Sequence, residues 1–345
     1  MRPSRNIILT GAGFTKDFGG YLVGEMWSAI FSQREIAQNQ KLRLKLLEEL
    51  NYEAAYHDVL DSREFSPMER AAFTTAVENA YREMHEMVCG LSSRRKNVAK
   101  FIFREVFARF AGSEDERGFL FTLNQDLFIE TFYRNHDGVL RNHQLSPAGL
   151  NTPSWCFGGG PIPNVLSSQD WVQLPTEDEV TELQSRFWDS NPERRFVYIK
   201  LHGSYGWRST NGSKAMVIGG EKEERIASEP LLRWYLKIFE QVLAGPDCNL
   251  LVIGYGFKDA HINKLICNAI NNHQLRVFVI SPIQPERFCY DVLNAAFCLS
   301  PNRVIWEGLY GYYCGTVLNL VDMEKLRLTP DGKAFFRKMG IRERQ

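Results

Sequence analysis

The amino-acid sequence predicts an α/β fold in which a parallel sheet carries helices on both faces and one large helical insertion. Short apolar runs recur along the chain and alternate with segments of helical spacing, which is typical of parallel α/β sheets. Each apolar run ends in a glycine or a polar residue, as strands do where an open α/β sheet binds its ligand. The helical segment between the first two runs is much longer than one crossover helix, which predicts an insertion.

The composition is that of a globular protein with a substantial core, since 44% of the 345 residues are hydrophobic and 24% are charged. The 41 lysines and arginines balance the 41 aspartates and glutamates, which argues against direct nucleic-acid binding, because such binders usually carry a basic excess. A net charge of zero is compatible with assembly into an oligomer.

No apolar run reaches the roughly 20 residues that cross a bilayer, and no signal peptide is evident, so we expect a cytoplasmic protein without membrane contact.

The first apolar run, Asn6-Ile7-Ile8-Leu9-Thr10, predicts a short strand that is buried on both faces. Gly11-Ala12-Gly13 follows it directly. Glycines after a buried strand allow a sharp turn, and the N–H groups of such a turn can bind phosphate oxygens. The third glycine of the dinucleotide fingerprint would stand at Lys16 and is absent. From these residues alone, a nucleotide site and an ordinary strand-to-helix turn both remain open.

Residues 21–115 form the predicted helical insertion. Apolar residues at helical spacing mark four segments in it, which are residues 26–31, 41–50, 67–89 and 98–110. The insertion has more apolar positions than a single crossover helix needs. We therefore expect it to form the contacts of a homo-oligomer.

A second buried strand is predicted at residues 118–123, ending in the polar residues Asn124, Gln125 and Asp126. Residues 127–133 follow as a helix, which Asn124 or Asp126 is suited to cap.

Residues 136–195 are rich in glycine, proline, asparagine and serine, which predicts an irregular insertion or lid. One short helix is expected inside it at residues 176–188. We expect its aromatic residues Trp155, Phe157 and Trp171 to close over the site, as lids do when they exclude water.

Three further strands are predicted at residues 196–201, 249–253 and 275–280, with helices at residues 231–243 and 261–272. Together these elements predict a Rossmann-like sheet. Because the carboxyl ends of parallel strands meet at one edge, four polar clusters should converge on one cleft. These clusters are residues 11–15, 124–126, 202–204 and 254–256.

We assign residues 1–300 to one domain and residues 301–345 to a C-terminal extension, which is expected to add a strand and a helix.

The four clusters, in this order, resemble the Sir2 (sirtuin-like) family. Gly11-Ala12-Gly13-Phe14-Thr15 matches the first sirtuin motif, with threonine for serine, and Thr122-Leu123-Asn124-Gln125-Asp126 keeps the Thr, Asn and Asp of the second. Leu201-His202-Gly203 matches the stretch with the catalytic histidine. The fourth cluster, residues 253–263, looks like the I-G-Y-x-F-x-D-x-H-I stretch of Sir2-like domains in bacterial anti-phage defence proteins.

Two departures from the deacylase sirtuins bear on function. No two of the seven cysteines form a C-x-x-C pair, so the zinc ribbon is missing and no metal is expected. That ribbon helps to form the acyl-lysine channel of deacylases, and its loss argues against a deacylase. The P-D-F-R stretch expected after Gly19 is also missing, since Tyr21-Leu22-Val23 stands there.

The resemblance implies roles for the site residues, with NAD as the substrate. Asn124 and His202 would be catalytic, because an amide can bridge a ribose hydroxyl and a water, and a histidine titrates in the range of a general base. The other implied contacts are Asp126 at the nicotinamide amide, Gly11, Ala12, Gly13 and Thr15 at the pyrophosphate, and Gly254, Tyr255 and Ser281 along the adenosine half. Asp259 and His261 are expected only to cap the helix that follows them.

The leading hypothesis is a zinc-less NAD⁺ hydrolase (NADase) that depletes NAD⁺ during phage infection. An NAD or ADP-ribose sensor without turnover and an NAD-dependent protein deacylase are the alternatives. An unregulated NADase would kill its host, so gating by oligomerisation or by a partner is expected. The family suggests a HerA-like helicase ATPase or a short Argonaute-type protein as that partner, and the sequence does not choose between them.

Overall fold

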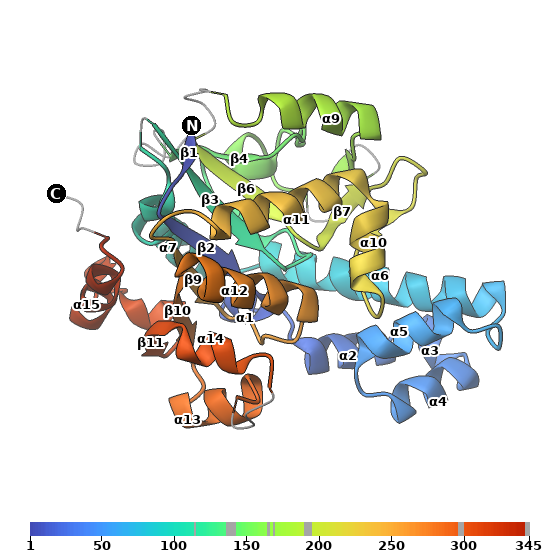
Figure 1. The fold of residues 1–345 in the computed structure, drawn as a ribbon. Helices are drawn as coiled ribbons and strands as arrows, with labels where there is room; N and C mark the ends of the chain where they lie inside the picture. The colour runs from blue at the N-terminus through green and yellow to red at the C-terminus, as the bar shows by residue number, and fades with distance from the viewer. Residues whose placement is uncertain are drawn as a thin grey trace.

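The computed structural model describes residues 1–113, 115–135, 143–163, 166–167, 170–189, 195–295 and 300–341. Its centre is an eight-stranded sheet in which paired strands run parallel, in the order β11-β10-β9-β2-β3-β6-β4, with β1 beside β3 (Figure 1). These strands are β1 (Arg2–Pro3), β2 (Asn6–Thr10), β3 (Glu116–Thr122), β4 (Leu145–Pro147), β6 (Phe196–Lys200), β9 (Asn249–Ile253), β10 (Arg276–Ser281) and β11 (Leu309–Cys314). The predicted α/β class is confirmed.

Two hydrophobic cores lie on opposite faces of this sheet. Successive residues of β2 point to alternate faces, so Ile8 belongs to one core while Ile7 and Leu9 belong to the other. All three side chains are fully buried. A strand that is covered on both faces needs an unbroken apolar run, which is the pattern that the sequence shows here.

The helical insertion runs from α2 to α7 and begins after the short helix α1. Helices α2 to α5 pack together beside one end of the long helix α6, away from the sheet (Figure 1). A capping box formed by Ser66 and Glu69, with Pro67 in the first turn, begins α6. The helices are α1 (Ala12–Lys16), α2 (Val23–Phe31), α3 (Arg34–Ala37), α4 (Gln40–Glu48), α5 (Tyr52–Asp61), α6 (Pro67–Cys89) and α7 (Ser93–Glu105).

The later helices complete the covering of the sheet. They are α8 (Phe128–Phe132), α9 (Glu177–Arg186), α10 (Lys222–Ser228), α11 (Pro230–Leu243), α12 (Ala260–His273), α13 (Pro285–Arg287), α14 (Arg303–Glu307) and α15 (Pro330–Lys338). Helix α9 confirms the short helix that was predicted inside the irregular segment. Other parts of that segment, at residues 136–142, 164–165, 168–169 and 190–194, lie outside the described residues.

A small second sheet was not predicted from the sequence. It contains β5 (Val172–Gln173), β7 (Gly203–Arg208) and β8 (Lys214–Met216), and its strand β7 begins directly after His202. Gly203 makes this turn possible, because its φ is +71° and a Cβ there would lie 1.9 Å from the carbonyl oxygen of Ala215.

The C-terminal segment extends the main sheet, as expected from the sequence. Strand β11 pairs in parallel with β10, and a two-stranded ribbon of β12 (Val321–Asp322) and β13 (Arg327–Leu328) leads to α15. Phe335 of α15 packs edge-on against Phe278 of β10. Side chains of β12, β13 and α15, among them Phe335 and Phe336, belong to one of the two hydrophobic cores. Among the described helices, none is long and apolar enough to cross a membrane.

Candidate active site

The ends of five strands lie in register at one edge of the main sheet. Thr10 is paired with Thr122 on one side and with Ile253 on the other, while Thr122 also pairs with Lys200 and Ile253 with Ile280. The loops that follow these strands therefore begin at the same position along the strand direction, side by side at this edge of the sheet. The predicted polar clusters after β2, β3, β6 and β9 do come to this edge together.

The glycine turn after β2 packs directly against the turn after β9. The N–H of Gly11 donates to the carbonyl of Ile253 at 2.9 Å, and that of Gly13 donates to the carbonyl of Gly254 at 2.8 Å. A Cβ on Gly254, whose φ is +65°, would lie 2.3 Å from the backbone nitrogen of Phe14. These glycines are thus required by the close approach of two backbones, and two of the N–H groups proposed for phosphate are already engaged.

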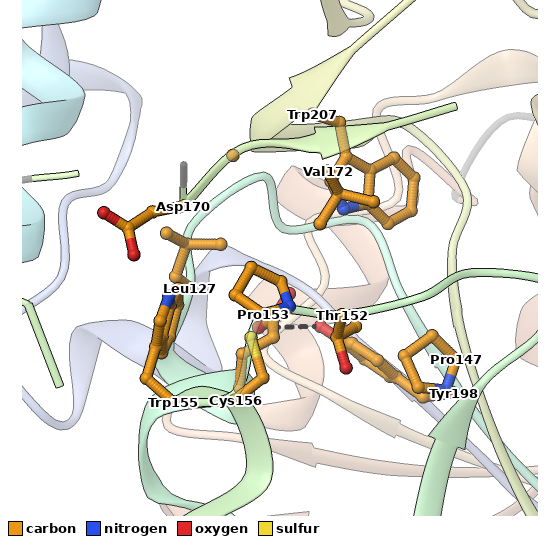
Figure 2. Close-up of a pocket in the computed structure, with 12 residues that line it drawn as sticks. Leu127, Pro147, Thr152, Pro153, Trp155, Cys156, Asp170, Val172, Tyr198 and Trp207 are labelled. Atoms are coloured by element: carbon orange, nitrogen blue, oxygen red, sulfur yellow. Dashed lines mark hydrogen bonds between the residues drawn. The ribbon is translucent and has the colours of Figure 1, made fainter. Parts of the chain in front are cut away.

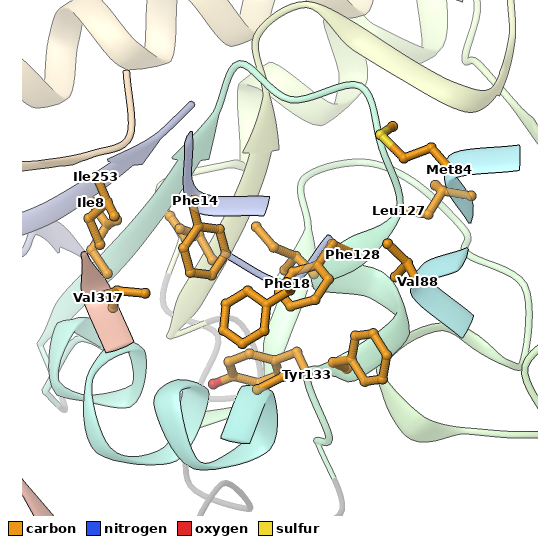
Figure 3. Close-up of a cluster of buried hydrophobic side chains, with 14 of the residues drawn as sticks. Ile8, Phe14, Phe18, Met84, Val88, Leu127, Phe128, Tyr133, Ile253 and Val317 are labelled. Atoms are coloured by element: carbon orange, nitrogen blue, oxygen red, sulfur yellow. The ribbon is translucent and has the colours of Figure 1, made fainter. Parts of the chain in front are cut away.

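Helix α1 is held in place beneath this turn by an aromatic cluster, which Figure 3 shows. Phe14 packs edge-on against Phe128 with ring centroids 5.6 Å apart, and Phe18 stacks on Phe128 at 4.6 Å. Phe14, Phe18 and Phe128 are at most 1% exposed. Burial of these rings fixes the position of Ala12, which is exposed at the start of the helix.

Asn124 is oriented by the glycine turn and does not cap α8. Its amide nitrogen donates to the carbonyl of Gly11 at 3.0 Å and to Oγ1 of Thr15 at 2.9 Å. Both amide hydrogens are therefore used, and the amide oxygen is the group that the side chain can offer to a ligand. Asp126 is the residue of the two that contacts the start of α8, since its Oδ1 accepts the N–H of Phe128 at 2.9 Å, while Leu127 is the N-cap residue.

A buried ion pair supports the loop that carries Asn124 and Asp126. Nζ of Lys200 lies 2.9 Å from Oε1 of Glu130, and the side chains are 1% and 5% exposed. Lys200 also donates to the backbone carbonyl of Asp126, and the hydroxyl of Tyr198 donates to Glu130 at 3.2 Å. Burial raises the pKa of Glu130 although the ammonium of Lys200 opposes this shift.

His202 follows β6 and is 3% exposed. Its Nε2 lies 3.0 Å from Nε2 of His261, which is in the first turn of α12. Burial lowers the pKa of His202 to about 3, although the charge of Asp259 opposes the shift. Burial also lowers the pKa of His261. Both rings are therefore neutral near pH 7.

The expectation that Asp259 and His261 only cap α12 was wrong. Asp259 occupies the N-cap position but makes no side-chain capping bond. Its Oδ1 instead lies 2.7 Å from Nζ of Lys222, which also lies 2.8 Å from Oε2 of Glu53 in the helical insertion. Burial raises the pKa of Asp259, but attraction by the protonated form of His202 and by the ammonium of Lys222 outweighs burial and lowers it overall. No local pattern indicated Lys222 or Glu53, because their partners are distant in the chain.

His202, Asp259 and His261 also form a group whose nitrogen and oxygen atoms lie within 4.8 Å of one another, close enough to hold a metal ion. The ammonium of Lys222 on Asp259 disfavours a cation there, because like charges repel. Each cysteine in the described part of the chain is free. The prediction that no metal is bound stays a prediction.

Tyr255 and Ser281, assigned to the adenosine half of NAD, make local contacts in the structure. The hydroxyl of Tyr255 donates to Oδ1 of Asn263 at 2.9 Å and accepts the N–H of Asp259 at 3.1 Å. Oγ of Ser281 accepts the N–H of Ile283 at 3.3 Å. Tyr255 therefore shapes the turn that presents Asp259 and His261.

The aromatic residues of the expected lid are already packed. Trp155 and Phe157 are each 4% exposed and belong to a hydrophobic core. The guanidinium of Arg208 lies 3.6 Å from the ring centre of Trp171. Trp155 also lines a small pocket with Tyr198 (Figure 2). Of the three rings, Trp155 lines that pocket, and the burial of Trp155 and Phe157 contradicts the expectation that they are free to close over the strand ends.

Comparison with known protein families gives one match. Residues 118–295, slightly more than half of the chain, match the family model of the SIR2-like domain. This range includes Asn124, His202, Asp259 and His261. A search of curated proteins found no match.

Proposed function

Because the chain belongs to the family of SIR2-like domains, whose members are in general NAD-dependent enzymes, we propose that it is an NAD⁺ hydrolase. The reaction would split the bond between nicotinamide and ribose. Water adds to the ribose carbon, nicotinamide leaves, and ADP-ribose and one proton are released. A cyclic product would form if a group of the same molecule attacked in place of water.

One observation carries this proposal, which is the placement of Asn124 and His202 two residues beyond the paired residues Thr122 and Lys200. The sheet thus brings an amide oxygen and a neutral imidazole to the ends of neighbouring strands. Cleavage of a glycosidic bond passes through a cation-like sugar, so it needs a group that holds the nucleophile and a base that takes its proton. Asn124 would hold the water or a ribose hydroxyl, and His202 would take the proton.

The other implied contacts can be refined from the geometry. Oδ1 of Asp126 accepts the N–H of Phe128, so Oδ2 is the oxygen that would accept the nicotinamide amide. Gly11 and Gly13 have engaged N–H groups, so their contribution would be the close approach of the backbone to the pyrophosphate. Thr15 would act through Asn124, whose amide its hydroxyl accepts.

The proposed enzyme would be poorly active until a partner acts on it. A base with a pKa of about 3 is neutral at pH 7 but accepts protons weakly. Substrate or a partner would have to raise that pKa. We assign the protein to anti-phage defence by NAD⁺ depletion in the cytoplasm, with a HerA-like ATPase or a short Argonaute-type protein as candidate partners.

The helical insertion would mediate the homo-oligomer. Leu44 and Leu47 stand one helical turn apart on α4 and are 49% and 52% exposed, and Leu50 just after the helix is 67% exposed. Neighbouring exposed leucines are typical of a surface that another chain covers.

Chromatographic measurement of NAD⁺ loss tests the function, with and without the product of the adjacent gene. Asn124→Ala and His202→Ala should each lower turnover by about 10²-fold or more, because each removes a group that acts in the transition state. Asn272→Ala and His273→Ala, at exposed positions of α12, are the matched controls and should keep full turnover.

Calorimetric titration with NAD⁺ separates the alternatives. Wild-type protein that binds NAD⁺ but never cleaves it, alone or with the adjacent gene product, would support the sensor instead. Cleavage that continues unchanged in both alanine variants would show that the catalytic assignment is wrong.

A further inference from the structure

The contact between His202 and His261 constrains where the protons of both rings lie. Their Nε2 atoms are 3.0 Å apart and their ring planes meet at 43°. A hydrogen bond at this distance needs one proton between the two nitrogens, because two N–H groups would repel and two lone pairs would not attract. One ring is therefore the donor and the other the acceptor.

The position of His261 in the fold decides which ring accepts. His261 is the second residue of α12, a helix of 14 residues, and the N-terminus of a helix carries partial positive charge. That charge favours a lone pair at His261 and disfavours an imidazolium there. In the neutral pair, His261 is therefore the acceptor and His202 the donor.

The turn before α12 holds His261 rigidly. Asn263 donates to the carbonyl of Phe257 at 2.7 Å and accepts from Tyr255 at 2.9 Å, while Asp259 donates its N–H to Tyr255. Phe257 has a φ of +51°, a strained value that this network maintains. The charged groups around the pair are Asp259 in the same turn, Lys222 and Glu223 on α10, and Glu53 on α5.

We propose that His261 is a positioning residue, which accepts the Nε2–H of His202 and so leaves Nδ1 of His202 with the lone pair that takes the substrate's proton. The arrangement is that of a histidine base oriented by an acceptor behind it, with a neutral imidazole where other enzymes use a carboxylate. This inference rests on the proposed function for the identity of the reaction. The tautomer itself does not depend on it.

Nitrogen-15 NMR of protein labelled in histidine tests the tautomers without any turnover. His202 should carry its proton on Nε2 and His261 on Nδ1, with both rings assigned through His202→Gln and His261→Gln. A proton on Nδ1 of His202 would overturn the proposal. If NAD⁺ were not cleaved at all, the proposed function would fail while the tautomer result would stand.

Kinetics under the conditions that activate the wild type give the second test. His261→Leu should lower kcat by about 10²-fold and change KM by less than about twofold, because the base is misoriented while NAD contacts remain. His261→Gln should recover much of kcat, since its amide oxygen can accept the same proton. His273→Leu on the same helix is the control. An unchanged kcat in His261→Leu, or equal losses in the leucine and glutamine variants, would overturn the positioning role.

Discussion

Replacement of Lys200 by methionine tests the ion pair that lies beneath the site. Lys200 and Glu130 are both almost fully buried, with 2.9 Å between Nζ and Oε1. Methionine keeps most of the volume of the lysine stem but leaves the carboxylate of Glu130 without its counter-charge. It also removes the donor to the carbonyl of Asp126, and with it the support of the loop that carries Asn124.

The expected destabilisation is about 3–5 kcal/mol, the range observed when one partner of a buried pair is removed. Glu130 can reduce this cost by taking up a proton, since burial already raises its pKa. The double variant Lys200→Met with Glu130→Gln removes both charges. It should recover most of the loss, because neutral residues of similar volume replace buried ion pairs at little cost.

Urea unfolding at pH 7, followed by circular dichroism and by tryptophan fluorescence, measures these free energies. The control is Arg287→Met, which removes an exposed pair with Asp291 whose side chains are 76% and 56% exposed. That change should cost less than about 1 kcal/mol. The reasoning is refuted if Lys200→Met costs no more than the control, or if the double variant is less stable than the single one.

Three further outcomes are expected. Burial raises the pKa of Asp17 from 3.8 to about 6, so the folded protein should lose stability as pH rises between these values. Asp17→Asn should therefore stabilise by about 1 kcal/mol at pH 7, after solvent screening, and give no gain near pH 4, in thermal unfolding. Leu47→Glu should convert a homo-oligomer into smaller species by light scattering, whereas a wild-type monomer would contradict the interface. Elemental analysis should find far less than one zinc per chain, and a stoichiometric value would point to His202, Asp259 and His261.

The sequence by itself determined the local elements of this protein. The run Ile7-Ile8-Leu9 predicts a strand covered on both faces, because side-chain alternation and burial act over a few residues. The same holds for the start of α6 at Ser66 and Pro67, where the capping signal is contained in four residues. The polar endings of the strands were also readable, and parallel pairing then requires that they share an edge.

Only the tertiary structure decided which side chains meet. His202 and His261 are 59 residues apart, and Lys222 joins Asp259 to Glu53 across three different elements. No periodicity connects such positions, since their contact depends on how helices α5, α10 and α12 pack around the sheet. For the same reason the sequence does not show that the backbone of Gly254 packs against Gly11 and Gly13 and leaves no room for a Cβ on either. Side-chain partners are set by packing at a distance, which a local pattern does not encode.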